Sequence, residues 1–190
     1  MKVISGTLKG RNIEGYNIDG TRPTMDRVKE SIFSTIQDYI KESTILDLFA
    51  GSGQLGIEAI SNGAKSCYFI DNNKEVINVL NKNINNLNIS NKSKVFLSDW
   101  KKFLNNTNTK FDIIFIDPPY KYNVYEKILE KIISLNLLNK NGLIIIEYQN
   151  LTLKEKYQNL ILYKEKKYGN KSVNIYKIDW QIFFVMLSFN

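Results

Sequence analysis

Four consecutive residues, Asp117, Pro118, Pro119 and Tyr120, have side chains suited to holding a flat amine for chemistry. The two prolines fix φ and have no N–H, so the turn is stiff and presents carbonyl oxygens. The Asp117 carboxylate and the Pro118 carbonyl can both accept hydrogen bonds from an NH2 group, and Tyr120 can stack on a ring. A ring-conjugated amine is a poor nucleophile, and placement with fixed dipoles is the main way to assist it. These four residues are therefore the candidate catalytic group.

A glycine-rich segment from Asp47 to Gly56 contains the pattern G-x-G-x-x-G between a predicted strand and a predicted helix. Asp71 stands twenty residues beyond Gly51. Such glycines permit close approach of the backbone to a ligand, and the acid can bind ribose hydroxyls. The pattern predicts a cofactor with an adenosine group. S-adenosylmethionine and NAD both have one, and the Asp-Pro-Pro-Tyr segment favours S-adenosylmethionine.

Acidic residues recur at or near the ends of five predicted strands. In open parallel sheets, ligands bind at the carboxyl ends of the strands, so we expect these side chains to face one crevice. The residues are Asp47, Asp71, Asp99, Asp117 and Glu147.

Alternating strand and helix patterns must position these groups. Val28, Ile32, Ile36 and Ile40 recur every fourth position and predict an amphipathic helix over residues 24–39. Thr24 is its predicted N-cap. Strands are predicted at residues 44–49, 66–71, 93–98, 111–116 and 142–147, with helices at 54–62, 73–87, 100–105 and 124–136.

This alternation predicts an α/β fold with a mainly parallel sheet covered on both faces. Two further strands, at 160–168 and 172–179, lie close together and predict an antiparallel hairpin at the sheet edge. Residues 2–14 predict two short strands around a turn at Leu8-Lys9-Gly10.

The composition fits one soluble domain of 190 residues. No apolar stretch approaches the roughly 20 residues of a membrane span, and none follows Lys2 as in a signal peptide. With one cysteine, Cys67, and no histidine, a disulfide, a zinc site and a Ser-His or Cys-His mechanism are not expected. We expect a cytoplasmic monomer without a metal.

The net charge of +7 is compatible with a nucleic-acid partner, although a codon bias toward lysine explains at least half of it. Only three arginines occur against 23 lysines, and all three stand near the N-terminus. They indicate sites that need a planar, bidentate group for phosphates or bases. The predicted RNA-binding residues are Lys9, Arg11, Arg22 and Arg27.

Over about residues 2–178 the chain resembles the RsmD family, bacterial methyltransferases that act on guanine N2 of small-subunit ribosomal RNA. The glycine loop and the Asp-Pro-Pro-Tyr turn are shared with many methyltransferases, whereas the block around Arg22 and Arg27 is more specific to the family. The matching segments are Ile4 to Arg11, Thr21 to Glu30, Asp47 to Gly56, Asp117 to Tyr120 and Tyr168-Gly169.

The resemblance implies a Rossmann-like class I methyltransferase fold, with seven main strands of which the last is antiparallel, and an N-terminal hairpin over residues 1–20. It implies S-adenosyl-L-methionine as cofactor and 16S rRNA in a partly assembled 30S subunit as substrate. Asp117, Pro118 and Tyr120 would act on the target base, and Arg22 would lie beside it. The implied cofactor-binding residues are Thr24, Asp47, Phe49, Ala50, Gly51, Gly53, Asp71, Asn72, Asp99 and Trp100.

Two features depart from the family. Trp100 replaces a small residue, which puts the lining of the adenine pocket in doubt, and residues 180–190 add an apolar tail. Three other functions stay open on the residues alone. They are a DNA adenine-N6 methyltransferase, an NAD-linked oxidoreductase, and a non-catalytic RNA-binding assembly factor.

Overall fold

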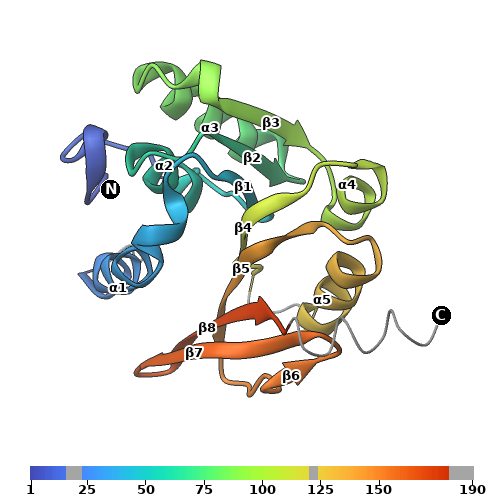
Figure 1. The fold of residues 1–190 in the computed structure, drawn as a ribbon. Helices are drawn as coiled ribbons and strands as arrows, with labels where there is room; N and C mark the ends of the chain where they lie inside the picture. The colour runs from blue at the N-terminus through green and yellow to red at the C-terminus, as the bar shows by residue number, and fades with distance from the viewer. Residues whose placement is uncertain (16–22, 120–123, 180–190) are drawn as a thin grey trace.

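The structure is a computed structural model that describes residues 1–15, 23–119 and 124–179, with the backbone alone for residues 23–25. Five α-helices and eight strands follow one another along the described part of the chain (Figure 1). The α-helices are α1 (Pro23–Ile40), α2 (Gln54–Ser61), α3 (Lys74–Asn86), α4 (Trp100–Asn106) and α5 (Tyr125–Ser134). The strands are β1 (Thr44–Asp47), β2 (Ser66–Asp71), β3 (Ser93–Leu97), β4 (Phe111–Ile116), β5 (Leu138–Gln149), β6 (Lys156–Tyr157), β7 (Leu160–Tyr168) and β8 (Lys171–Ile178). Two short 3-10 helices, at Gly6–Leu8 and Ser90–Lys92, complete the described elements.

All eight strands form one sheet in the order β3-β2-β1-β4-β5-β8-β7-β6. Strands β1 to β5 pair in parallel, and β8 runs antiparallel to both β5 and β7. The mainly parallel sheet and the antiparallel hairpin near its edge are therefore confirmed. The sheet has eight strands where seven were predicted. The additional strand, β6, is only two residues long, which is too short to show a pattern of alternating apolar and polar residues.

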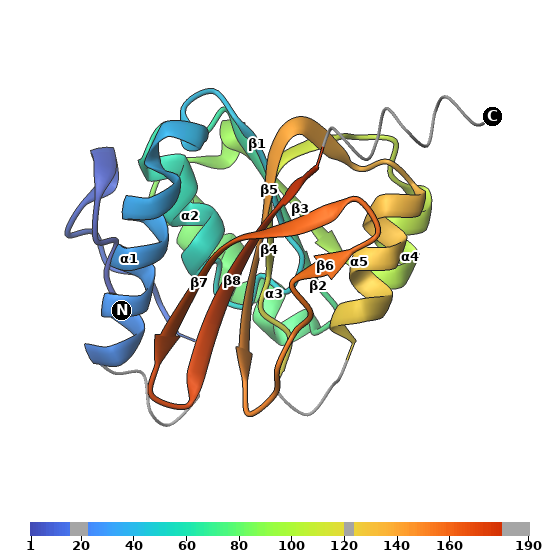
Figure 2. The same cartoon turned by 60° about the horizontal axis from the view of Figure 1, so that its bottom comes forward.

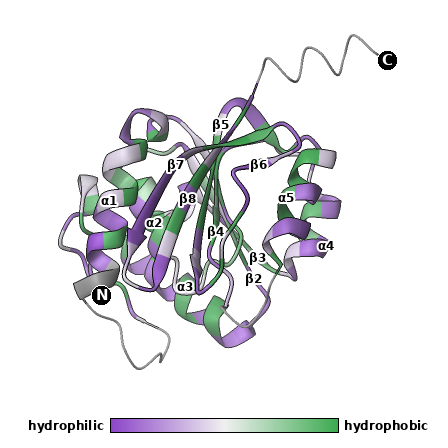
Figure 3. Ribbon diagram, turned by 90° about the horizontal axis from the view of Figure 1, so that it is seen from below, coloured by the Kyte–Doolittle hydropathy of each residue, from purple (hydrophilic) through white to green (hydrophobic). Residues whose placement is uncertain are grey.

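Helices cover both faces of the sheet, and each face has its own apolar core (Figure 2). The first core lies between the sheet and α1, α2 and α3, and the second lies between the sheet and α4 and α5. The four residues at helical spacing in α1 are at most 2% exposed, as their period predicts. The central strands are mainly hydrophobic, whereas β7 is mainly hydrophilic (Figure 3).

The N-terminal segment forms a bridge and a 3-10 turn in place of the two strands that the sequence predicts. A single antiparallel bridge joins Lys2 to Asn12. The backbone N–H groups of Ile4 and Ser5 donate instead to the carboxylate of Glu58, at 3.0 and 2.7 Å. Because Glu58 in α2 takes these donors, the segment is tied to a helix and cannot extend its strand pairing.

Helix α1 begins at Pro23, so the prediction of Thr24 as its N-cap was wrong. Proline suits the first helical position because its missing N–H would have no partner there. Arg22 and the tail 180–190 lie outside the described residues. Within the described part of the chain, no helix combines the length and apolarity that a bilayer crossing requires.

Candidate active site at the carboxyl edge of the sheet

The ends of four neighbouring strands bring acidic side chains to one edge of the sheet. Asp47 ends β1, Asp71 ends β2, Asp117 follows β4, and Glu147 lies near the end of β5. Ile116 pairs with Ile146, so Asp117 and Glu147 follow at the same level of adjacent strands. The arrowhead of β5 and the turn between β7 and β8 lie together at the lower side of Figure 2. These four residues therefore lie at one edge of the sheet, as the strand pattern predicts, whereas a crevice that all five acidic side chains face stays a prediction.

The glycine loop between β1 and α2 forms a tight turn, and one of its glycines, Gly51, has free space beside its backbone. Gly51 and Gly53 have φ of 55° and 90°, conformations that favour glycine. A Cβ on Gly53 would lie 2.5 Å from Leu80, and one on Gly56 would lie 2.2 Å from Phe69. A Cβ on Gly51 would meet nothing within 4 Å. Gly53 and Gly56 thus allow close packing of the helix, while the Gly51 backbone lies beside space that a ligand can enter.

Asp71 links this loop to the end of β2. Its Oδ2 accepts a hydrogen bond from the Gly51 N–H at 3.0 Å, and its Oδ1 accepts one from the Asn73 N–H at 2.9 Å. Asp71 is half-buried and Asn72 is exposed. A carboxylate oxygen has more than one acceptor direction, so Asp71 can still accept bonds from ribose hydroxyls. Loop and acid together fit an adenosine-type ligand.

Asp47 is a buried carboxyl, only 2% exposed, whose Oδ2 accepts a hydrogen bond from the Gly56 N–H at 3.0 Å. Burial raises its pKa to about 7, with a smaller upward contribution from Asp71 and an opposing one from the Gly56 bond. The side chain therefore fixes the start of α2 against the end of β1.

Asp117 stands at the start of the proline turn, with Pro118 buried and Pro119 exposed. Burial raises the pKa of its carboxyl well above the usual range. The negative charges of Glu147 and Asp47 add to this effect, and the Lys171 ammonium opposes it. Asp117 is half-buried, and burial is the main reason that its ionisation is disfavoured. Tyr120 lies outside the described residues.

Asp99 has a local structural partner. It is the N-cap of α4, and its Oδ1 accepts hydrogen bonds from the N–H groups of Lys101 and Lys102. Its placement near an adenine amino group stays a prediction. Trp100 and Phe49 are half-buried against the second core, and Ala50 is buried in the first.

Of the predicted RNA-binding residues, the three that the structure describes lie at different edges of the sheet. Arg11 donates a hydrogen bond at 2.7 Å to the carbonyl of Asn86, the last residue of α3, and Lys9 follows the 3-10 turn packed on the end of α2. Both helix ends face the amino edge of the sheet. Arg27 is exposed in the first half of α1, which faces the carboxyl edge because α1 leads into β1. Arg22 and the side chain of Thr24 lie outside the described residues.

Two residues that make polar contacts near this edge, Lys171 and Asn83, were not identified from the sequence. Lys171 approaches Glu147 only because β8 pairs antiparallel with β5. Asn83, in α3, donates hydrogen bonds to the carbonyls of Glu14 and Ser52, both at 3.0 Å, and so ties the N-terminal segment to the glycine loop. No local pattern marks either residue, because both roles depend on contacts far along the chain.

Two observations on the described residues complete the account of the site, one on a hollow and one on groups of metal-binding side chains. A hollow lined by residues that include Lys41, Asp112 and Lys177 lies at the amino edge, away from the carboxylates. No group of three or more His, Cys, Asp or Glu side chains within the described ranges is arranged to hold a metal ion.

Comparison with known proteins matches residues 1–177 to the family described as Conserved hypothetical protein 95. The protein YlbH of Bacillus subtilis strain 168 is 38% identical over 181 residues, covering 93% of this chain and 98% of that protein. A protein of Haemophilus influenzae named Ribosomal RNA small subunit methyltransferase D is 37% identical, covering 93% of each chain. The solved structure of yhhF from Escherichia coli superposes with a TM-score of 0.85 at 31% identity, covering 94% of this chain and 98% of that one.

Proposed function

The chain belongs to the Conserved hypothetical protein 95 family, and on this premise we propose that it methylates the exocyclic N2 amine of a guanine in 16S ribosomal RNA. This is the RsmD family that the motifs resemble, and that expectation is confirmed. Relatives that cover most of the chain are named as methyltransferases of small-subunit ribosomal RNA. Methylation of ribosomal RNA follows from these relatives. The guanine N2 position and a 30S particle as substrate are the finer part of the proposal.

The cofactor is S-adenosylmethionine, which supplies a methyl group on a sulfonium. Gly51 would approach it through its backbone, because the space beside that residue is open. Asp71 would accept hydrogen bonds from the ribose hydroxyls, and Asp47, Phe49, Ala50 and Gly53 would line the loop around the methionine end. Asn72, Asp99, Trp100 and Thr24 would complete the pocket.

The observation that carries the proposal is the position of Asp117 beside the glycine loop. Strand β4, which Asp117 follows, pairs directly with β1, which leads into the loop. An amine held by the Asp117 carboxylate and the Pro118 carbonyl would therefore lie next to the cofactor pocket. Pro119 would keep the turn rigid, and Tyr120 would stack on the base. The base must leave its helix to reach this turn, as is common for enzymes that act on bases.

A methylation assay with three substrates tests the proposal: 30S particles, bare 16S rRNA and duplex DNA, each with mass analysis of the modified nucleosides. We expect N2-methylguanosine, with 30S particles the best substrate. N6-methyladenine in DNA would contradict the proposal, and so would binding of the cofactor without transfer to any substrate.

A variant of the turn separates catalysis from cofactor binding. Asp117→Ala should lower turnover by orders of magnitude and leave cofactor affinity near that of the wild type. Normal methylation by this variant would remove the turn from the active site.

A further inference from the structure

Ser52 lies between two glycines in the loop that would hold the cofactor, a role of the loop that rests on the proposed function. Gly51 and Gly53 have φ of 55° and 90°. Glycine loses more conformational freedom on ordering than any other residue, so a Gly-Ser-Gly segment has little preference of its own for one shape. Contacts from outside the loop must therefore select the shape that leaves the Gly51 backbone beside open space.

Two hydrogen bonds hold the peptide group that joins Ser52 to Gly53. Its oxygen, the Ser52 carbonyl, accepts a hydrogen bond from Asn83 Nδ2 at 3.0 Å. Its N–H, that of Gly53, donates to the carbonyl of Ala50 at 2.8 Å. Because a peptide group is planar and rigid, a bond at each end fixes the orientation of the whole plane. The Ala50 bond lies within the loop, whereas the Asn83 bond ties the plane to helix α3.

The amide of Asn83 is in turn oriented by the N-terminal segment. Its Oδ1 accepts a hydrogen bond from the Glu14 N–H at 2.8 Å, and its Nδ2 donates one to the Glu14 carbonyl at 3.0 Å. This cyclic pair of bonds distinguishes the oxygen end of the amide from the nitrogen end. An asparagine amide has two N–H donors, so the second one is directed to Ser52. Asn83 is 1% exposed, so water competes little for these bonds.

Asparagine has the set of donors and acceptors that this position needs. An aspartate would keep an acceptor for the Glu14 N–H but would have no donor for either carbonyl, and a serine hydroxyl has one donor for two carbonyls. The same face of α3 also approaches the loop through Leu80, three residues before Asn83. A Cβ on Gly53 would lie 2.5 Å from the Leu80 side chain. Helix α3 thus supplies both an apolar contact and a polar tether to the loop.

We propose that Asn83 is a positioning residue for S-adenosylmethionine, and that it holds the glycine loop in the shape that receives the cofactor while Glu14 orients its amide. Asn83 needs no contact with the cofactor. Its effect passes through the peptide plane after Ser52 to the backbone of Gly51, beside which a ligand can enter. Without the tether the loop samples other shapes, and the cofactor must order it at a cost in affinity.

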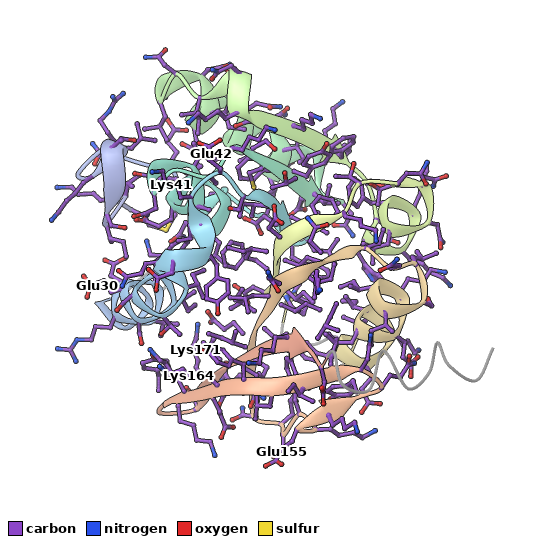
Figure 4. The ribbon with its side chains drawn as sticks, viewed as in Figure 1. Glu30, Lys41, Glu42, Glu155, Lys164 and Lys171 are labelled. Atoms are coloured by element: carbon purple, nitrogen blue, oxygen red, sulfur yellow. The ribbon has the colours of Figure 1, made fainter. Side chains whose placement is uncertain are left out.

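A tether that only stabilises the fold would act differently. Loss of the Asn83 amide would then lower the free energy of unfolding but leave the cofactor affinity of the folded chain unchanged. Asn174, in β8, is the matched control, because it is also 1% exposed and both ends of its amide bond to tyrosine hydroxyls. Strands β4 and β5 separate β8 from β1 in the sheet. The β7–β8 hairpin, marked by Lys164 and Lys171, lies apart from the N-terminal segment (Figure 4).

The experiment measures the Kd of S-adenosylmethionine by isothermal titration calorimetry with the full chain and without RNA, and urea unfolding of the same variants. We expect Asn83→Ala to raise the Kd about 10-fold, the equivalent of one hydrogen bond. Asn174→Ala should leave the Kd unchanged, although both variants should unfold at lower urea concentrations than the wild type. An unchanged Kd in Asn83→Ala, or an equal rise in Asn174→Ala, would overturn the proposal. Absence of binding by the wild type would instead contradict the cofactor itself, and this role with it.

Changes at the exposed Glu14 decide the matter if Asn83→Ala does not fold. Glu14→Pro removes the N–H that orients the amide, whereas Glu14→Ala removes the same side chain and keeps that N–H. The proline variant should raise the Kd about 3-fold, because the bond to Ser52 is weakened without being lost. The alanine variant should bind like the wild type, and equal Kd values in the two variants would overturn the proposal. These measurements need no methyl transfer, so their result is separate from that of the methylation assay.

Discussion

The backbone N–H of Gly51 donates a hydrogen bond to Asp71 Oδ2 at 3.0 Å, which joins the glycine loop after β1 to the end of β2. This hydrogen bond fixes two elements that are expected to hold the cofactor relative to each other.

Replacing Asp71 should therefore weaken cofactor binding more than it weakens the fold. Asp71→Ala removes an acceptor for ribose hydroxyls and frees the Gly51 N–H. A hydrogen bond to a charged group contributes about 1.5–3 kcal/mol, so we expect an increase in Kd of roughly 10- to 100-fold. Isothermal titration with S-adenosylmethionine measures it, with the exposed Asp38→Ala as control. An unchanged Kd would show that Asp71 does not hold the cofactor.

Asp47 makes the stability of the fold depend on pH. Its pKa is about 7 in the folded chain against 3.8 for an unperturbed aspartate, so the folded state keeps a proton that the unfolded state loses. Stability should then fall as the pH rises from about 4 to about 7, by roughly 1.4 kcal/mol per pH unit, and should be constant through this group at higher pH.

Asp47→Asn removes this dependence and keeps an oxygen that can accept from Gly56. The gain in unfolding free energy over the wild type should be larger at pH 8 than at pH 5, by roughly 3 kcal/mol. Urea unfolding at the two pH values measures the difference, and Asp38→Asn should show none. Equal gains at both pH values would argue against a protonated Asp47 at pH 5.

The secondary structure could be predicted from sequence wherever one local period decided it. The burial of Val28, Ile32, Ile36 and Ile40 and the parallel order of β1 to β5 followed from apolar spacing and from strand–helix alternation. The N-terminal segment could not be predicted in this way. Its backbone donors bond to Glu58, more than fifty residues away, and no local pattern contains that partner.

The candidate site also contains residues that could be predicted from the sequence and one that could not. Asp47, Asp71 and Asp117 could be placed at one edge because parallel strands point their carboxyl ends in one direction. The approach of Lys171 to Glu147 depends on the register of an antiparallel pair, in which Gln149 lies opposite Lys171. A hairpin turn would fix the register, but β6 and β7 separate β5 from β8 in the sequence, so no local turn specifies which residue lies opposite Lys171.

Glu58 should be a major anchor of the N-terminal segment. It is fully buried, and its carboxylate accepts hydrogen bonds from the N–H groups of Ile4 and Ser5 and from the Ser5 hydroxyl at 2.8 Å. Glu58→Ala should lower the unfolding free energy by roughly 3 kcal/mol, because three hydrogen bonds to a buried carboxylate are lost. Trypsin should also cut faster at Lys9 and Arg11. Glu155→Ala removes an exposed carboxylate and should change neither quantity, and a similar result for both variants would contradict the anchoring role.

Arg27 should contribute to RNA binding through phosphates near the carboxyl edge of the sheet. Arg27→Gln should weaken binding of 16S rRNA and lower the slope of log Kd against log salt by about 1. Fluorescence anisotropy at several salt concentrations measures the slope. Lys65→Gln is the matched control, since Lys65 is exposed just before β2 at the amino edge. Equal slopes for wild type and Arg27→Gln would remove Arg27 from the phosphate contacts.

Tyr125 and Tyr176 should respond in opposite ways to loss of their hydroxyl groups. Both are at most 1% exposed. Among the described residues, the Tyr125 hydroxyl has no hydrogen-bond partner. The Tyr176 hydroxyl donates to the Lys154 carbonyl at 2.7 Å and accepts from Asn174 at 3.1 Å.

An unpaired buried hydroxyl costs about 1–3 kcal/mol, so Tyr125→Phe should raise the unfolding free energy by up to that amount. Tyr176→Phe should lower it by a similar amount, because the Lys154 carbonyl loses its donor. Urea unfolding at pH 8 measures both. A loss of stability in Tyr125→Phe would mean that its hydroxyl does bond in solution, and the edge beside Asp117 would then contain one more ordered polar group.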